Sequence, residues 1–380
     1  MKGTEKGLLK ILDGADKRLY IPVYQRNYDW KKENCDLLFR DLLKLITTDK
    51  KSHFFGSIVT AHLSGGGSED FVIIDGQQRI TTVSLLFLAM INAVKNGDAE
   101  IENQRLCEKI MDTYIVDEYS SDEKKVRLKP TKDDAEAFNK IVAGDVDRFI
   151  DNSNVTNNYN IFYNSIKEMP YNVDQLYEAI RKLCVIDIFV ENDDDPQLIF
   201  ESLNSTGLKL TEADTIRNFV LMGLEAKTQE EYYTRYWLYI EKNTNKTKTA
   251  NFFRDYLTVK QGKIPAIRDV YFVFKKYAED QDILPILVEL LKYSKIYNKI
   301  LTSHTLCKDI DITLKRLNTL DMTVTYPFLL ALFDYAHEVE VPEEDLINTL
   351  SCLETYIVRR LICGIPTNAL NTIFCTLHKD

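Results

Sequence analysis

Apolar and polar residues along this chain follow two patterns, and one replaces the other near residue 211. Before that residue, short runs rich in β-branched and aromatic side chains predict strands. These predicted strands span residues 54–63, 71–74 and 184–190, and residues 18–24 form an extended segment fixed by Pro22. Apolar residues at helical spacing predict helices among them, over residues 31–46, 80–95 and 196–203. The glycine run at residues 65–67 predicts that the strands at 54–63 and 71–74 pair as a hairpin.

After residue 211 the strand signal fades, and helical patterns rich in Tyr, Leu, Ile and Lys continue almost to the end of the chain. We expect loops between these helices at residues 244–249 and 339–344. The change of pattern predicts an α+β domain over residues 1–210 and an all-α helical domain over residues 211–380.

Composition and charge narrow the class of protein. The chain has 380 residues, 45% of them hydrophobic, which is enough for one large core or two domains. A net charge of −10 and a pI near 5.2 argue against a wholly basic nucleic-acid binder but leave a local basic groove open. Seven cysteines without CxxC spacing favour reduced thiols. No signal peptide is visible, and the longest apolar stretch is shorter than the ~20 residues of a membrane span. We therefore expect a soluble, cytoplasmic protein with no membrane partner.

Polar side chains gather where the strand at residues 71–74 gives way to the helix at 80–95. Residues 75–79 read Asp-Gly-Gln-Gln-Arg, hereafter the DGQQR segment. A helix N-terminus exposes unpaired N–H groups that attract anions. Gln77, Gln78 and Arg79 add donors that suit phosphate oxygens. The segment is therefore a candidate phosphate or nucleotide site.

The residues around these donors have candidate roles of their own. Asp75 can hold Mg²⁺ or orient a water, because hard cations prefer carboxylate oxygen. Gly76 lets the backbone approach a ligand closely, and Thr81 or its neighbour Thr82 caps the helix or contacts the ligand. An ordinary strand–turn–helix, with Arg79 in a surface ion pair, accounts for the same residues about equally well.

A second cluster lies at residues 21–30, where a proline precedes donors interleaved with aromatic rings. Tyr24, Gln25 and Arg26 form its centre, and the mixture suits base stacking with phosphate contacts alongside. The alternative is that the aromatic residues, Trp30 above all, belong to the core that leads into the next helix. Gln25 and Arg26 are less easily explained that way.

A third cluster follows the predicted helix at residues 196–203. The helix is expected to end near Asn204, with Gly207 in a left-handed turn. Thr211 then caps the next helix, and Asp214 completes an acidic capping box. Capping accounts for most of this cluster, while Asn204 and the two residues after it remain candidates for ligand contact from a loop.

Several common chemistries have no motif here. The five histidines never fall in metal-ligand spacing, and neither a Walker loop nor a nucleophile elbow is present. A basic stretch at residues 124–132 suits DNA backbone contact, but flanking carboxylates favour a solvated face. Direct nuclease action is disfavoured because no carboxylate-rich metal site is recognisable.

The three clusters occur in an order that resembles a known family. The segments that carry the resemblance are IPVYQRNYDW, FFGSIV, IDGQQRITT and IFESLNSTGLKLTEADTIRNFV, with weaker support from RLKPTKDDAEAF and RRLICGIPTNALNTIF. Together they resemble the GmrSD-type restriction endonuclease N-terminal domain family, and the similarity covers nearly the whole chain.

The resemblance implies a ParB/sulfiredoxin-like α+β fold with a small mixed sheet, followed by a helical domain. It also implies binding and hydrolysis of a nucleoside triphosphate (NTP) with Mg²⁺, in a bacterial anti-phage protein that restricts modified DNA. The implied catalytic residues are Asp75, Gln78 and Arg79, with Asp75 on the metal. The implied nucleotide-binding residues are Tyr24, Gln25, Arg26, Gly76, Gln77, Thr81 and Asn204.

One departure from the family concerns the nuclease. Many relatives continue into a C-terminal His-Asn-His-type nuclease domain, whereas this chain stops at Asp380, where that domain would begin. We therefore expect a nuclease domain or subunit as a partner and no DNA cleavage by this chain alone. The alternative function is a non-catalytic module that binds modified DNA or a partner protein.

Overall fold

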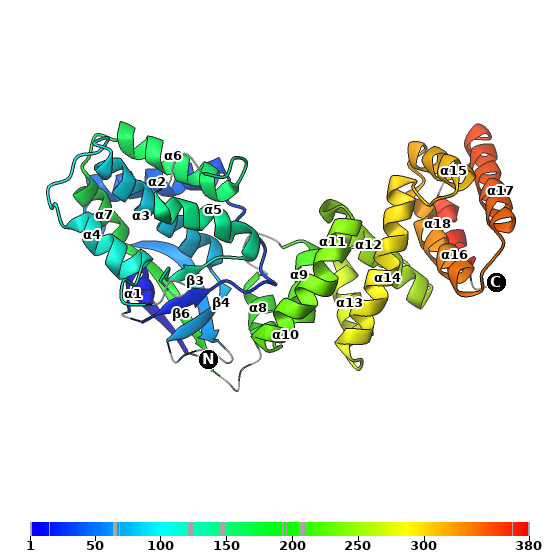
Figure 1. Ribbon diagram of the computed structural model, residues 1–380, viewed down its shortest axis with the longest axis horizontal. Helices are drawn as coiled ribbons and strands as arrows, with labels where there is room; N and C mark the ends of the chain where they lie inside the picture. Colours follow the sequence, from blue (N-terminus) through cyan, green and yellow to red (C-terminus); the bar gives the residue numbers. More distant parts are fainter. Residues whose placement is uncertain are drawn as a thin grey trace. The chain divides into compact units, whose positions relative to one another are not determined.

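The computed structural model divides the chain into two compact units, residues 1–207 and 208–380. Figure 1 shows a sheet covered by helices in the first unit and helices alone in the second. The structure describes residues 2–14, 16–63, 67, 69–120, 125–144, 149–191, 194, 196–204, 210–366 and 368–378.

The first unit is built on a six-stranded sheet with the order β1-β6-β3-β4-β2-β5. The strands are β1 (Lys2–Gly7), β2 (Arg18–Tyr20), β3 (His53–His62), β4 (Asp70–Asp75), β5 (Leu128–Lys129) and β6 (Leu183–Val190). β3 pairs antiparallel with β4, as the hairpin prediction requires, and parallel with β6. β1 is antiparallel to β6, and β2 runs parallel to both β4 and β5. The predicted α+β class with a mixed sheet is confirmed.

Helices cover one face of this sheet (Figure 1). The long ones are α2 (Lys32–Thr47), α3 (Gln77–Lys95), α6 (Asn154–Glu168) and α7 (Val173–Arg181). The others in this unit are α1 (Leu8–Leu12), α4 (Leu106–Ile110), η1 (Met111–Ile115), α5 (Lys132–Ala143) and α8 (Pro196–Asn204). α3 packs on α6 and is buried along almost its whole length, because it is apolar nearly all round.

The predicted elements are found within a few residues, with two informative differences. α3 begins at Gln77 and not near residue 80, so the polar Gln-Gln-Arg residues form its first turn. β1 was not predicted, because Lys2–Gly7 is polar and lacks an alternating pattern. It pairs at the edge of the sheet, where a strand needs little apolar surface.

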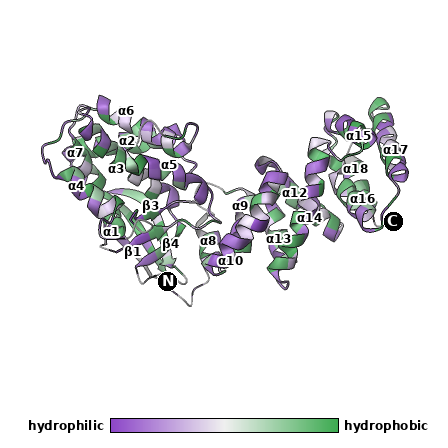
Figure 2. Cartoon of the chain, in the orientation of Figure 1, coloured by the Kyte–Doolittle hydropathy of each residue, from purple (hydrophilic) through white to green (hydrophobic). Residues whose placement is uncertain are grey.

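The described part of the second unit, residues 210–366 and 368–378, contains helices and no strand, as predicted. Its longer helices are α9 (Glu212–Leu221), α12 (Thr249–Gln261), α13 (Val270–Ala278), α14 (Ile283–Thr302), α15 (Lys308–Thr319), α16 (Tyr326–Glu338), α17 (Glu343–Ile362) and α18 (Asn368–Thr376). The short helical segments are α10 (Ala226–Tyr232), η3 (Tyr233–Trp237), α11 (Leu238–Asn243), η4 (Lys246–Lys248), η5 (Ile267–Asp269) and η6 (Thr323–Thr325). These helices carry hydrophobic and hydrophilic stripes (Figure 2). In the described ranges, none of the helices is both long enough and apolar enough to cross a membrane.

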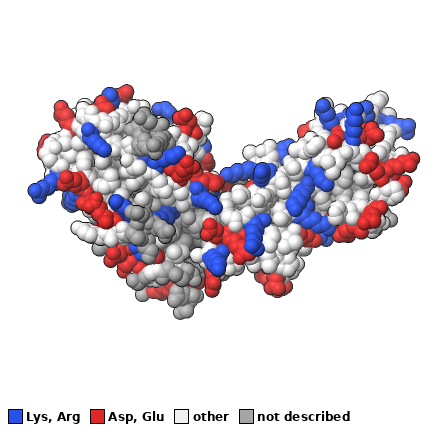
Figure 3. Space-filling model, in the orientation of Figure 1, with Lys and Arg blue, Asp and Glu red and all other residues white. Residues whose placement is uncertain are grey.

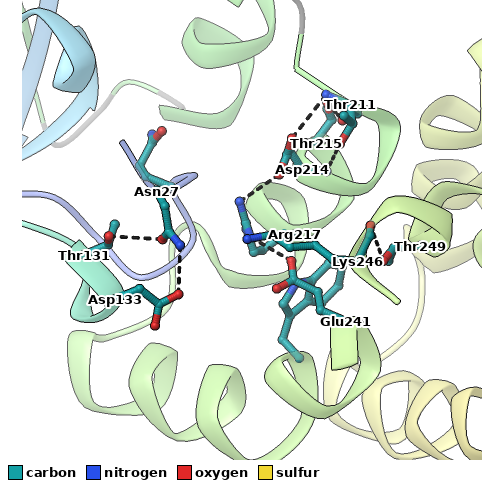
Figure 4. Close-up of polar contacts among 12 residues, drawn as sticks. Asn27, Thr131, Asp133, Thr211, Asp214, Thr215, Arg217, Glu241, Lys246 and Thr249 are labelled. Carbon is teal, nitrogen blue, oxygen red and sulfur yellow. Dashed lines mark hydrogen bonds and ion pairs between the residues drawn. The ribbon is translucent and has the colours of Figure 1, made fainter. Parts of the chain in front are cut away.

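α9 starts at the capping box that the sequence predicts. The Thr211 hydroxyl accepts from the Asp214 N–H at 3.1 Å, and the Asp214 carboxylate accepts from the Thr211 N–H at 3.3 Å (Figure 4). Asp214 also pairs with the buried Arg217, whose other Nη lies 2.7 Å from Glu241 on α11. The cap is therefore also one end of an ion-pair network that joins α9 to α11.

A buried carboxylate lies in the core of the second unit. Asp255 on α12 is 2% exposed and accepts from the Tyr297 hydroxyl at 3.4 Å. Its partner Arg254 lies 3.2 Å away. Burial raises the pKa of Asp255 to about 7, although Arg254 opposes the shift.

This raised pKa predicts a pH dependence of stability. Between the ordinary aspartate pKa and about 7, the folded protein keeps a proton that the unfolded chain has lost. The free energy of unfolding should therefore fall as pH rises through this window, by up to about 1.4 kcal/mol per pH unit from this group. Urea unfolding of the wild type and of Asp255→Asn at several pH values measures it.

The comparison isolates Asp255 from every other titrating group. Asp255→Asn should remove part of the fall, whereas Asp269→Asn, an exposed aspartate in the same unit, should leave it unchanged. Equal pH profiles for the wild type and Asp255→Asn would contradict a proton on this carboxylate.

Candidate functional site

The DGQQR segment forms the junction between β4 and α3. Gly76 is the N-cap of α3 and has a φ of 94°, in the left-handed region. A Cβ at this position would lie 3.0 Å from both the Ser57 carbonyl oxygen and the Ile58 Cγ1. Glycine is required here both by the backbone angle and by the close approach of β3.

The first turn of α3 is tied to the loop after β2 through Gln25. The Gln25 Nε2 donates to the Ile74 carbonyl at 2.8 Å, and its Oε1 accepts from the Gln77 Nε2 at 3.0 Å. Both glutamines are buried, at 5% and 6% exposure. Buried amides of this kind are costly unless paired, so their bonds fix the loop against the end of β4.

Gln78 makes a second connection of the same type. Its Oε1 accepts from the Asp29 N–H at 2.8 Å, and its Nε2 donates to the Asn27 carbonyl at 3.2 Å. One side chain therefore satisfies a backbone donor and a backbone acceptor of the loop at residues 22–30.

A third set of hydrogen bonds holds the far end of the same loop. The Tyr28 hydroxyl shares a hydrogen bond of 2.7 Å with Thr82 and accepts from the Asn158 Nδ2 at 3.1 Å. The Tyr28 N–H donates to the Asp134 carboxylate at 2.6 Å. Asn27 binds both Thr131 and Asp133 (Figure 4). The loop is thus fixed to α3, α5 and α6 together.

Several predicted ligand residues are therefore buried, and the three glutamines among them hold the local structure through hydrogen bonds. The buried residues are Tyr24, Gln25, Gln77, Gln78 and Thr81, each between 2% and 8% exposed. Burial raises the pKa of the Tyr24 phenol, which keeps it neutral. This arrangement favours a positioning role for these side chains over direct phosphate contact.

Arg79 is the accessible cation of the segment. Its guanidinium lies on the backbone of β3, where a Cβ on Gly56 would be 2.6 Å from its Nε and 2.8 Å from its Cζ. Its Nη1 donates to the Ser57 carbonyl at 3.0 Å, and its side chain is 29% exposed. Among the described residues only Asp75 also pairs with it, so most of its five N–H donors are available to an anion.

Asp75 is the accessible carboxylate at the end of β4. Its Oδ2 lies 3.3 Å from the Ser57 hydroxyl and 3.8 Å from the Arg79 Nη1, and its side chain is 27% exposed. Within the described residues, no three His, Cys, Asp or Glu side chains gather closely enough to form a metal site alone. One carboxylate with one hydroxyl does fit Mg²⁺ that takes its other ligands from water and phosphate.

The remaining predicted site residues have fewer described contacts. Arg26 is partly exposed, follows the anchored Gln25, and has no ion pair or hydrogen bond with the described residues. Asn204 is the last residue of α8, and its side chain lies outside the described part of the structure, as does Gly207. In the basic stretch, Arg127 is buried and binds the carbonyls of Gly14 and Asp112, so it does not belong to a solvated face.

Sequence reasoning missed Gly56 and Ser57 as parts of the site. Gly56 has a φ of 105° in the middle of β3, and the Arg79 guanidinium occupies the space that a side chain would need. The available signal was a glycine inside a predicted strand, which often marks the close approach of another group.

Two surface cavities lie elsewhere in the first unit. Each measures about 610 Å³, one beside the C-terminal half of α3 and one between residues 97–100 and 166–175. Neither is lined by a residue of the DGQQR segment. The chemistry of the side chains, and not the depth of these hollows, identifies the candidate site.

Comparison with known protein families places the chain in one of them. Residues 8–221 match the family described as GmrSD restriction endonuclease, N-terminal domain. The match spans more than half of the chain, so this chain belongs to that family, as the motifs had indicated. It includes β2 to β6 and ends at the last residue of α9. No curated protein matches the chain.

The position of Arg79 over Gly56 predicts a specific steric effect. Gly56→Ala combines a left-handed backbone with a collision against the guanidinium. Gly97→Ala has a positive φ of 75° but nothing within 4 Å of the new Cβ. We expect Gly56→Ala to reduce the free energy of unfolding by about 1–3 kcal/mol more than Gly97→Ala. Urea unfolding measures both.

A double variant tests whether Arg79 causes the difference. Adding Arg79→Ala to Gly56→Ala should recover about 1 kcal/mol or more relative to additive behaviour, because the collision is removed. Strict additivity of the two substitutions would mean that the guanidinium does not lie over Gly56.

Proposed function

We propose that the DGQQR segment binds a nucleoside triphosphate with Mg²⁺ and hydrolyses it. The observation that carries this proposal is the accessible Arg79–Asp75 pair beside the first turn of α3, held there by buried amides. A cation, a carboxylate and unpaired helix N–H groups at one place are the groups that phosphoryl transfer uses.

Arg79 and the first N–H groups of α3 would bind phosphate oxygens. Both are fixed before any ligand binds. Arg79 packs against Gly56, and hydrogen bonds of Gln25 and Gln78 hold the helix turn. Preorganised donors stabilise charge that develops in the transition state without a cost for reorganisation. Arg26, on the anchored loop, is the candidate for a second phosphate contact.

Asp75 would hold the metal together with the Ser57 hydroxyl, or orient the attacking water. Bound Mg²⁺ would neutralise charge on the phosphates. The Arg79 guanidinium, 3.8 Å away, would keep the Asp75 carboxylate oriented until the ligand binds. Tyr24, Gln25, Gln77, Gln78 and Thr81 serve in this proposal as the frame of the site.

Family membership gives this nucleotide chemistry a context. We infer that the chain is the nucleotide-dependent sensor part of a bacterial anti-phage restriction protein that acts on modified DNA, working with a nuclease domain or subunit. The second candidate is a module that binds nucleotide or DNA without turnover. It is supported by the finding that no three His, Cys, Asp or Glu side chains gather into a metal site among the described residues.

The test is a panel of nucleoside triphosphates with Mg²⁺, in which both binding and phosphate release are measured. Asp75→Asn should lower the rate of phosphate release by about 100-fold or more while binding changes less, because the charge acts mainly in the reaction. Arg79→Ala should weaken both binding and turnover, by about 100-fold in turnover.

The matched control is Asp49→Asn, an exposed aspartate in the loop after α2. It should hydrolyse at the wild-type rate. Wild-type turnover in Asp75→Asn would disprove the assignment, and nucleotide binding without turnover in the wild type would favour the non-catalytic module.

A further inference from the structure

The second unit carries a group of lysines that no neighbouring carboxylate neutralises. They are Lys242, Lys246, Lys248, Lys295 and Lys299, all exposed. None of the five forms an ion pair with another residue in the described range 210–366. In Figure 3, Lys and Arg side chains gather over the part of this unit that Figure 1 labels α11, α12 and α14.

The five lysines lie on two helices that contact each other and on the turn after the first of them. The Asn243 Nδ2 at the end of α11 donates to the Ser294 hydroxyl in α14 at 2.9 Å, so the two helices are in direct contact there. Lys295 follows Ser294 in the chain, and Lys246 and Lys248 belong to the turn that follows α11. We call this surface the α11–α14 face.

The periodicity of α14 keeps its lysines in solvent. The buried face of α14 includes Leu290, Tyr293 and Tyr297. Lys295 and Lys299 are four residues apart and therefore lie one above the other on the opposite side of the helix. Neither lysine packs in the core, and neither ammonium group forms an ion pair with another described residue of this unit.

The carboxylates nearest to this face in the sequence are already occupied. Glu241 pairs with Arg217 and accepts from the Trp237 indole at 2.8 Å. On the same stripe of α14 as Lys295 and Lys299, Lys292 pairs with Asp334 at 2.6 Å and with Glu338 at 2.9 Å. Each of these clusters holds two carboxylates and one cation and keeps a net charge of −1, so the five lysines outnumber the negative charge that remains.

The uncharged residues of the face also suit a polyanion. Tyr239 on α11 is 50% exposed and lies one turn before Asn243, on the same side of the helix. An exposed ring beside lysines can stack on a base or a sugar. The loop itself reads Thr-Asn-Lys-Thr-Lys-Thr at residues 244–249, a run of hydrogen-bond donors.

A membrane surface fits the same face less well. Helices that lie on a bilayer expose a continuous apolar side to the lipid. α14 exposes Leu284 and Val288 near its start, but Lys295 and Lys299 continue the same side of the helix. On α11 the exposed apolar residue Leu238 lies near Lys242, so no long apolar side faces solvent. Lysines with neutral polar neighbours are instead typical of contacts with phosphate backbones.

We propose that the α11–α14 face binds the sugar–phosphate backbone of duplex DNA, independently of the nucleotide site in the first unit. The contact is electrostatic and not sequence-specific, with each lysine neutralising one phosphate. It would hold the DNA, whereas the nucleotide site would regulate the partner nuclease. The DNA partner rests on the proposed function, but the location of the contact does not.

The experiment measures binding of a fluorescent DNA duplex to the full chain, without nucleotide, over a range of salt concentrations. The triple variant Lys246→Glu/Lys295→Glu/Lys299→Glu should bind at least about tenfold more weakly than the wild type at low salt. The slope of log affinity against log salt should become shallower by about 2–3, because about 0.9 is lost per phosphate contact.

The control triple variant, Lys227→Glu/Lys263→Glu/Lys308→Glu, changes three other exposed lysines of the same unit. It carries the same net charge and should keep nearly wild-type affinity and slope. Equal losses in both triple variants would overturn the assignment of the face, as would an unchanged affinity in the first. Loss of binding to phosphatidylserine vesicles, with DNA binding intact, would overturn it in favour of a membrane.

Two further measurements separate this proposal from the nucleotide proposal. Asp75→Asn should bind DNA as the wild type does, and the triple variant on the α11–α14 face should bind nucleotide as the wild type does. Failure of nucleotide binding in the wild type would leave the DNA result standing. DNA binding that depends on Asp75 and not on the lysines would overturn the location proposed here.

Discussion

The candidate site depends on the buried amides that join the loop at residues 22–30 to the first turn of α3. Gln25 and Gln77 hydrogen-bond each other, and Gln25 also donates to the backbone of β4. Gln78 hydrogen-bonds the backbone of the loop. A buried amide left without a partner costs about 1–3 kcal/mol, so the pairs stabilise each other only when both segments are in place. The turn that presents Asp75 and Arg79 is therefore fixed by residues that need not contact the ligand at all.

The two glutamines and the arginine that follow one another in the sequence have different structural roles. The glutamines face the loop and are buried, whereas Arg79 crosses to β3 and lies over Gly56. Asp75 meets Arg79 and Ser57 at the same edge. Two glycines make the approach possible, Gly76 at the helix start and Gly56 under the guanidinium. Local composition alone does not distinguish the residues that hold such a site in place from the residues that contact the ligand.

Much of the fold follows from the sequence. Apolar runs gave the main strands, the glycine run at residues 65–67 gave the hairpin, and Thr211 with Asp214 gave the capping box of α9. The start of α3 was placed too late, because Gln77 and Gln78 look like loop residues until their partners, about 50 positions earlier, are known. β1 was missed because a polar edge strand has no alternating pattern. The clusters at residues 21–30 and 75–79 were expected to be near each other from the family resemblance, but which side chains would be buried between them depends on tertiary contacts.

The most direct test of the central claim is a crystal structure with Mg²⁺ and a slowly hydrolysed nucleoside triphosphate analogue. The account predicts phosphate oxygens on the Arg79 guanidinium and on the first N–H groups of α3, with Mg²⁺ on Asp75. It also predicts that the bonds from Gln25 to Ile74 and from Gln78 to Asn27 and Asp29 remain in place. A nucleotide held by the Gln77 and Gln78 side chains, with the loop at residues 22–30 displaced, would contradict it.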